Sequence, residues 1–421
     1  SGGGLGVGAY LSSLHDFQQF GGKAQEYSLA AAMAPVPEAL PPIEQQRNDP
    51  ALREHLEHSY ARYAWGQVFS PLTWGRLHRG HFIERAFDDR ILGHRWREAK
   101  YASLSAASRP ARNGLTVGDL FPPAGGAVPN VRLPVWCPTA TALLNGAMFV
   151  FTPEHLRAYK IVEYMHRLEA VRADVGDPAK PRDEAQRRAY EAFIAGFPMA
   201  AAVGTSNSFP LAMPPPVLRS ALSPEYPYLY LTDGGLSDNL GVYTALRMLK
   251  TEPGAGVRHK GLIVLDARND GYAAVGNRER SPSILMTAAQ VPMAQLRGWH
   301  GRFQEVVEAL CKSPDYAGPG QEIHPVFLSM TQLSELTDCS PLRERGLSRG
   351  AMERLAARAG VATEGACAFI LAGNVATSLH ISPEEQEFLL AAGRWLVFHN
   401  ARAIREALGW PQPAGPVPPA K

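Results

Sequence analysis

The succession of elements between residues 226 and 266 limits this chain to few folds. Tyr226 to Leu231 carries aromatic side chains at alternate positions, which predicts a strand. A polar turn follows, then a helical pattern from Val242 to Lys250, and Gly261 to Asp266 is a short apolar run typical of buried parallel strands. Strand, helix and strand in this order predict an α/β fold, in which helices cover both faces of a sheet.

The composition excludes several functional classes. The 421 residues suffice for a large domain with an extension, and a net charge of +2 does not indicate a nucleic-acid surface. No segment approaches the roughly 18 apolar residues that a membrane-spanning helix needs. The four cysteines are scattered without a CxxC pair, so neither a disulfide framework nor a zinc site is expected: Cys137, Cys311, Cys339 and Cys367. We expect neither a metal nor a cofactor.

The chain begins with a serine and four glycines in six residues, Ser1 to Gly6. From Val7 onward apolar residues recur at spacings of three and four, which predicts a loop leading into a helix. Backbone N–H groups at a helix start can hold a developing anion, and a serine on such a turn is in the position of a nucleophile. Glycine runs also occur as flexible leaders, and that alternative remains open.

A second signal is Asp233, which follows the predicted strand and precedes Gly234 and Gly235. In an open parallel sheet, the carboxyl ends of strands form the edge where ligands bind. Asp-Gly after a strand is also a common turn signal, so a turn without catalytic function is the alternative.

Two further patterns have less weight. His78, His81 and Glu84 are three residues apart and could share a helix face, but on an arginine-rich face solvated or ion-paired side chains are expected rather than a metal site. The segment Gly346 to Gly350 fits Gly-x-Ser-x-Gly at Ser348, yet it lies between helical segments. We interpret it as a chance match, because the motif requires a strand, a turn and a helix.

Other segments give simple structural predictions. The small residues from Ala200 onward suit a helix packed tightly against a sheet, and Thr152 with Pro153 predicts a capped helix start. The remaining predictions are strands at Leu133 to Val135, Ala147 to Phe151 and Ile323 to Ser329, an exposed helix or insertion at Asp174 to Arg188, a long helix at Pro282 to Leu310, and one or two helices at Glu384 to Leu408.

The order of these signals resembles the patatin-like phospholipase family. In that family the nucleophile lies in a Gly-x-Ser-x-Gly elbow, which Ser1 to Gly6 matches from the serine onward, and the catalytic Asp lies in Asp-Gly-Gly, as Asp233 does here. Thr205 to Pro216 and Thr139 to Pro153 also resemble family segments. The resemblance covers most of residues 1 to 275, and its closest part is the bacterial form of the Asp motif.

The resemblance implies a three-layer α/β fold with a mainly parallel central sheet flanked by helices. Residues 1–275 would form the patatin-like domain, incomplete at its N-terminus. Residues 276–410 would be a mixed helical C-terminal extension packed on the core, and residues 411–421 a disordered tail.

For function, the resemblance implies a Ser–Asp dyad without histidine, with Ser1 as nucleophile and Asp233 as base. The N–H of Gly2 would stabilise the oxyanion, while Gly3, Gly234 and Gly235 allow close approach. The implied substrate is an acyl lipid such as a phospholipid, met at a membrane surface, with no nucleic acid and no transmembrane segment in this chain. The implied location is the cytoplasm or the periphery of a bacterial membrane.

The chain departs from the family pattern at its start. The family's oxyanion loop, Gly-Gly-Gly-x-Arg/Lys-Gly, precedes the elbow by tens of residues and does not occur here. We therefore expect a domain truncated at the nucleophile and a poor catalyst by itself. A competing alignment places Gly2, Gly3 and Gly4 on the oxyanion loop, but Gly6 then replaces its basic residue.

Three rival functions differ from the dyad. Ser1 could use its own α-amine as base, although N-terminal nucleophiles begin a strand rather than a glycine loop. The fold could be a non-catalytic lipid-binding or interaction domain, which the missing oxyanion loop favours. A Ser-His-Asp esterase is the third, but no histidine after Asp233 follows a strand.

Overall fold

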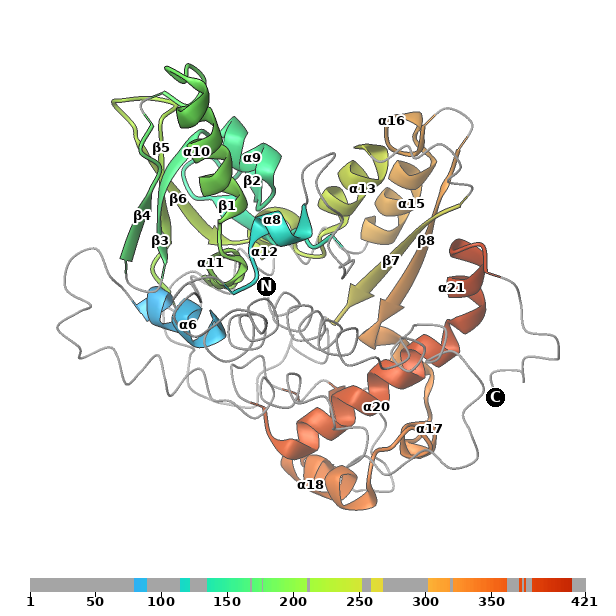
Figure 1. Ribbon diagram of the computed structural model, residues 1–421. Coiled ribbons are helices and arrows are strands. Elements are labelled where there is room, and N and C mark those ends of the chain that lie inside the picture. The colour runs from blue at the N-terminus through green and yellow to red at the C-terminus, as the bar shows by residue number, and fades with distance from the viewer. Residues whose placement is uncertain are drawn as a thin grey trace, which may run out of the picture. The chain divides into compact units, whose positions relative to one another are not determined.

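The computed structural model describes residues 79–88, 114–121, 135–166, 169–175, 177–209, 213–251, 259–267, 302–318, 321–361, 371–372, 375 and 381–410. They divide into two compact units between Asn239 and Leu240 (Figure 1). We call described residues 79–239 unit 1 and described residues 240–410 unit 2. The domain boundary predicted at residue 275 and the predicted tail lie outside the described residues.

Unit 1 contains a six-stranded sheet in the order β2-β1-β6-β5-β3-β4. The strands are β1 (Thr139–Ala142), β2 (Met148–Val150), β3 (Ile161–His166), β4 (Glu169–Arg172), β5 (Val217–Ser220) and β6 (Tyr228–Asp233). Every neighbouring pair is antiparallel, so the prediction of a mainly parallel central sheet is wrong. The reason is local: short loops join β1 to β2, β3 to β4 and β5 to β6, and only antiparallel neighbours can be joined so briefly.

The helices of unit 1 include one that is buried along its whole length. They are α6 (Arg79–Phe87), α8 (Val117–Leu120), α9 (Pro153–Ala158), α10 (Glu184–Ala195), α11 (Met199–Ser206) and α12 (Gly235–Asp238). All eight residues of α11 are buried, and the helix contacts α6, β1 and β6. Its small side chains allow this, since a Cβ on Gly204 would lie only 3.2 Å from Cβ of Glu84. The tight packing predicted for this segment is confirmed.

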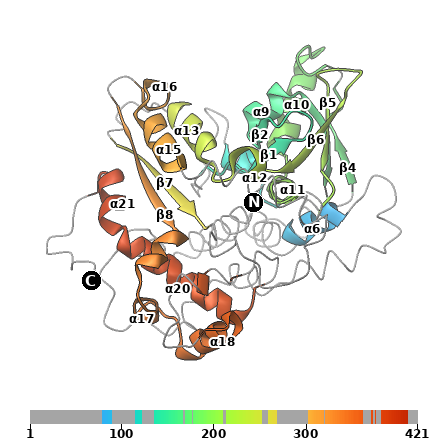
Figure 2. The ribbon, with the colours of Figure 1, turned by 180° about the vertical axis from the view of Figure 1, so that it is seen from behind.

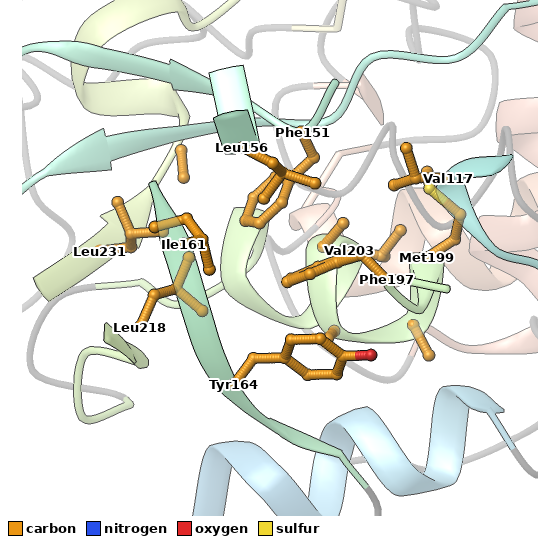
Figure 3. Close-up of a cluster of buried hydrophobic side chains, with 14 of the residues drawn as sticks. Val117, Phe151, Leu156, Ile161, Tyr164, Phe197, Met199, Val203, Leu218 and Leu231 are labelled. Carbon is orange, nitrogen blue, oxygen red and sulfur yellow. The ribbon is translucent and has the colours of Figure 1, made fainter. Parts of the chain in front are cut away.

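The core of unit 1 lies between the sheet and these helices (Figure 3). The rings of Tyr164 on β3 and Phe197 before α11 lie 4.5 Å apart between centroids, and Phe151 packs on Phe197 at 5.5 Å. Leu231 of β6 points into the same cluster and is fully buried. Because side chains alternate along a strand, Asp233 lies on the same face of β6 as Leu231. The core therefore fixes the strand that ends at Asp233.

Several local predictions for unit 1 can be compared with the structure. Thr152 caps α9 by accepting a hydrogen bond from the His155 N–H, with Pro153 as first helical residue, as predicted. The strand predicted at 147–151 is β2, and the one predicted at 226–231 is β6, shifted by two residues. The charged segment from 174 ends in α10, whose N-cap is Asp183. Of the strand predicted at 133–135 only Val135 is described, and it is outside any strand.

Unit 2 is built on a parallel pair of strands, β7 (Lys260–Asp266) and β8 (Ile323–Ser329). Both strands were predicted, and β7, which the sequence analysis placed within residues 1–275, belongs to this unit. The helices are α13 (Val242–Thr251), α15 (Phe303–Lys312), α16 (Pro314–Ala317), α17 (Ser340–Arg343), α18 (Arg349–Ala359), α20 (Pro383–His399) and α21 (Ala401–Ala407), with a 3₁₀ helix, η6, at Met330–Glu335.

Helices cover both faces of this strand pair (Figures 1 and 2). Helices α13 and α15 pack on one face, where Leu262 and Val264 meet Leu246. Helix α21 packs on the other, where Val326 and Leu328 contact Ile404. The prediction of α13 is confirmed, and the one or two helices predicted at 384–408 are two, α20 and α21. Residues 282–301 of the predicted long helix lie outside the described residues. Helices on both faces thus flank a two-stranded sheet only, and the strands predicted to share one α/β sheet, β6 and β7, belong to different sheets.

Among the helices that the structure describes, none combines the length and the apolar character needed to cross a membrane.

Candidate active site at the end of β6

Asp233 is the last residue of β6 and is 6% exposed. Its backbone is held from two sides. Its N–H donates to the carbonyl of Ser208 at 3.0 Å, and its carbonyl accepts a hydrogen bond from Oγ1 of Thr141 at 2.8 Å. Because Thr141 belongs to β1 and Ser208 follows α11, the carboxylate is positioned by the sheet and the buried helix together.

Among the described residues, a single group donates a hydrogen bond to the Asp233 side chain. Oδ1 accepts the N–H of Gly235 at 2.6 Å, and among the described residues no other hydrogen bond or ion pair reaches the carboxylate. Burial raises the pKa of Asp233 above its usual value and outweighs the Gly235 hydrogen bond, which lowers it. A carboxylate of raised pKa is a stronger base than an ordinary aspartate, as proton abstraction requires.

The two glycines after Asp233 are required by space. A Cβ on Gly234 would overlap the carbonyl oxygen and Oγ1 of Thr139, and one on Gly235 would lie 2.8 Å from Oδ1 of both Asp233 and Asn239. Gly234 has φ −64°, which any residue adopts, so close approach rather than backbone conformation excludes a side chain. The Asp-Gly-Gly sequence therefore brings the chain tightly past β1, and the catalytic role of the glycines remains a prediction.

Hydroxyl groups surround this turn, but they hold the backbone rather than the carboxylate. Oγ1 of Thr141 also lies 2.9 Å from Oγ of Ser237, which can donate this second hydrogen bond. Thr232 donates to the Ser208 carbonyl at 2.9 Å, and the Ser208 hydroxyl donates to the carbonyl of Gly204. Sequence reasoning missed Thr141 and Ser208 as positioning residues, because they are 92 and 25 positions from Asp233 (233 minus 141 and 233 minus 208) and only tertiary pairing joins them to it.

The other predicted site residues are placed as follows. Ser1, Gly2 and Gly3 lie outside the described residues, so their roles remain predictions. Ser348 is the N-cap of α18, where its Oγ accepts the Ala351 N–H at 3.2 Å, and no strand precedes it. Its motif match therefore lacks the strand that a nucleophile elbow requires.

The histidine and glutamate group on α6 is also described in part. His78 lies outside the described residues, while His81 and Glu84 are buried. Oε1 of Glu84 lies 3.2 Å from Nδ1 of His166 on β3, so Glu84 is ion-paired or hydrogen-bonded, as expected, though not solvated. Within the described ranges no group of three or more His, Cys, Asp or Glu side chains is arranged to hold a metal ion.

Comparison with known proteins gives no match: no protein-family model, no curated protein and no solved structure matches this chain. The function therefore has to be argued from the site.

Proposed function

We propose that this chain belongs to an acyl ester hydrolase of the patatin-like type, with Ser1 as nucleophile and Asp233 as general base. The supporting observation is the state of Asp233: it ends a central strand, is buried, has a raised pKa and meets no cation among the described residues. A structural carboxylate in such a place is usually paired, and an unpaired one is typical of catalytic sites. The motifs at Ser1 to Gly6 and at Asp233 to Gly235 also support the proposal, because they resemble those of the patatin-like family.

The chemistry is acyl transfer in two steps. As Oγ of Ser1 attacks the ester carbonyl carbon, its proton moves to the carboxylate of Asp233. The bond to the leaving alcohol then breaks, and Asp233 returns the proton to the departing oxygen. Water then attacks the acyl carbon of the acyl-enzyme while Asp233 takes its proton. The bond to Oγ of Ser1 breaks, Asp233 returns the proton to Oγ, and the carboxylic acid is released. The N–H of Gly2 would hold the negative oxygen of each tetrahedral intermediate.

The proposed substrate is an acyl lipid, such as a phospholipid. This part of the proposal rests on the resemblance to the patatin-like family. A non-catalytic lipid-binding domain is the alternative, and activity distinguishes the two.

The test is hydrolysis of a short-chain acyl ester by the full-length gene product, with covalent labelling by a phosphonofluoridate. Labelling forms an Oγ–P bond at Ser1 and releases fluoride, while Asp233 takes the hydroxyl proton. We expect Ser1→Ala to abolish labelling, and Asp233→Asn to reduce both labelling and hydrolysis by about 10³- to 10⁴-fold.

The control is Asp177→Asn, which changes an exposed aspartate of unit 1 that pairs with Lys160. It should leave hydrolysis unchanged. Wild-type rates in Asp233→Asn would overturn the dyad, and an inactive wild type that binds lipid vesicles would favour the binding domain.

A further inference from the structure

Arg345 lies between α17 and α18 in unit 2 and is 8% exposed. Its guanidinium carbon lies 3.8 Å from the centroid of the Phe398 ring on α20. The ring thus covers one face of the guanidinium. The N–H groups of a guanidinium lie in its plane, so this contact leaves them free to donate.

The Arg345 guanidinium has no acidic partner among the described residues. Its Nε is fully enclosed and has no hydrogen-bond partner. Burial lowers the pKa of Arg345, and the exposed Glu344 raises it by less. An arginine this deeply buried normally pairs with a carboxylate, since an unpaired buried charge destabilises the fold.

Neighbouring arginines show the usual arrangement. Arg349 pairs with Glu353 at 2.8 Å, and Arg354 and Arg358 both reach Glu384. These three arginines are exposed, with 47% or more of each side chain accessible, and still have acidic partners. Arg345, by contrast, is buried and has no acidic partner among the described residues.

A second arginine, Arg394, is hydrogen-bonded to the backbone of Arg345. Arg394 lies one helical turn before Phe398 on α20, and its NH1 donates to the carbonyl of Arg345 at 3.1 Å. Burial lowers its pKa as well, and no carboxylate pairs with it in the described part of the chain. The guanidinium of Arg394 therefore lies at the backbone of Arg345, whose own guanidinium lies on the ring of Phe398, one helical turn further along α20.

We propose that Arg345 and Arg394 form a binding site for a phosphate group. The planar fork of arginine matches two oxygens of a phosphate at once, and such a ligand would supply the missing negative charge. The site is independent of the proposed hydrolase, because it lies in unit 2 and involves no residue of the dyad. Free phosphate and the headgroup of a phospholipid present the same chemistry.

The test is calorimetric titration of the full chain with inorganic phosphate at low ionic strength. Arg345→Gln and Arg394→Gln should each weaken binding about tenfold or more, as expected when a charge-assisted hydrogen bond is lost. The matched control is Arg402→Gln, an exposed arginine of unit 2 that pairs with Glu406, and its affinity should stay within about twofold of wild type. Arg394 is half-buried, so its variant keeps the test decisive if Arg345→Gln fails to fold.

A second arm identifies the source of the phosphate. Sedimentation with phosphatidylcholine vesicles, with and without phosphatidate, is measured for the same variants. Binding that requires both phosphatidate and Arg345 assigns a lipid headgroup, while phosphate binding without vesicle binding assigns a free ligand. The proposal is overturned if neither phosphate nor phosphatidate binding by the wild type depends on these two arginines.

Discussion

Two buried carboxylates of the same sheet, Glu163 and Asp233, are 4% and 6% exposed, yet they are neutralised differently. Oε2 of Glu163 on β3 lies 2.9 Å from Nε of Arg172 and 3.7 Å from NH1 of Arg219, which come from the flanking strands β4 and β5. Asp233 on β6 lies between β1 and β5 and receives only the N–H of Gly235 from the described residues. At equal burial, Glu163 is thus ion-paired with two arginines, whereas Asp233 accepts one backbone hydrogen bond from the described residues.

The largest expected difference is in catalysis. Asp233→Asn should lower kcat/KM for ester hydrolysis about 10⁴-fold, since it removes the proposed base, whereas Glu163→Gln should change it less than about tenfold. Steady-state kinetics on both variants of the full-length product measures this. Similar losses in the two variants would erase the distinction drawn between them.

The turn that follows Asp233 gives the next largest effect, on stability. Gly234→Ala should lower the free energy of unfolding by about 3 kcal/mol, because its Cβ would overlap Thr139. Gly393→Ala, at an exposed position of α20 where a Cβ meets no atom within 4 Å, should instead raise it by about 1 kcal/mol. Urea denaturation measures the free energy of unfolding of both variants. An unchanged value for Gly234→Ala would mean that the turn can shift to make room for the added methyl group.

Removing the paired carboxylate should have a smaller cost. Glu163→Gln should lower the free energy of unfolding by about 1 to 2 kcal/mol, less than for a fully buried ion pair, because side-chain exposures of 60% and 51% leave Arg172 and Arg219 well hydrated. Chemical denaturation of Glu163→Gln, Arg172→Gln and the double variant measures the coupling. Strictly additive effects would show that the two side chains do not interact.

The smallest expected effect has the opposite sign. The raised pKa of Asp233 means that its protonated form is favoured in the folded state. Its contribution to stability is therefore fully present below its unfolded pKa and is lost as the pH rises through the folded pKa. Asp233→Asn should accordingly be more stable than wild type by about 1 kcal/mol at neutral pH, with the difference vanishing in acid. Thermal unfolding across pH checks this, and a less stable variant at pH 7 would contradict it.

Local signals in the sequence predicted the elements well. The apolar run at 261–266 and the strand at 323–329 occur as β7 and β8, and the Thr152 cap begins α9 as expected. The first of these strands was recognisable because its run of apolar residues is typical of a parallel strand. The alternating aromatic residues predicted a strand that ends at Leu231, and β6 continues two residues further to Asp233.

Pairing and burial between distant segments were beyond sequence reasoning. The succession of strands and helices gave no sign that unit 1 pairs its strands as antiparallel neighbours, which depends on contacts such as Ala140 with Asp233. Arg345 was missed for the same reason. Its segment is rich in arginine, and only the packing of α20 against it, through Phe398, distinguishes it from its exposed neighbours.

The pairing of β1 with β6 has a consequence for folding. Ala140 lies opposite Asp233, 93 positions later (233 minus 140), so a long loop must close before this pair can form. The hairpins on either side join neighbouring segments and can form early, whereas contacts of high sequence separation slow folding. During synthesis the Asp233 carboxylate would reach its final place only after the intervening segment has left the ribosome and collapsed, so assembly of the site would be a late event in the folding of unit 1.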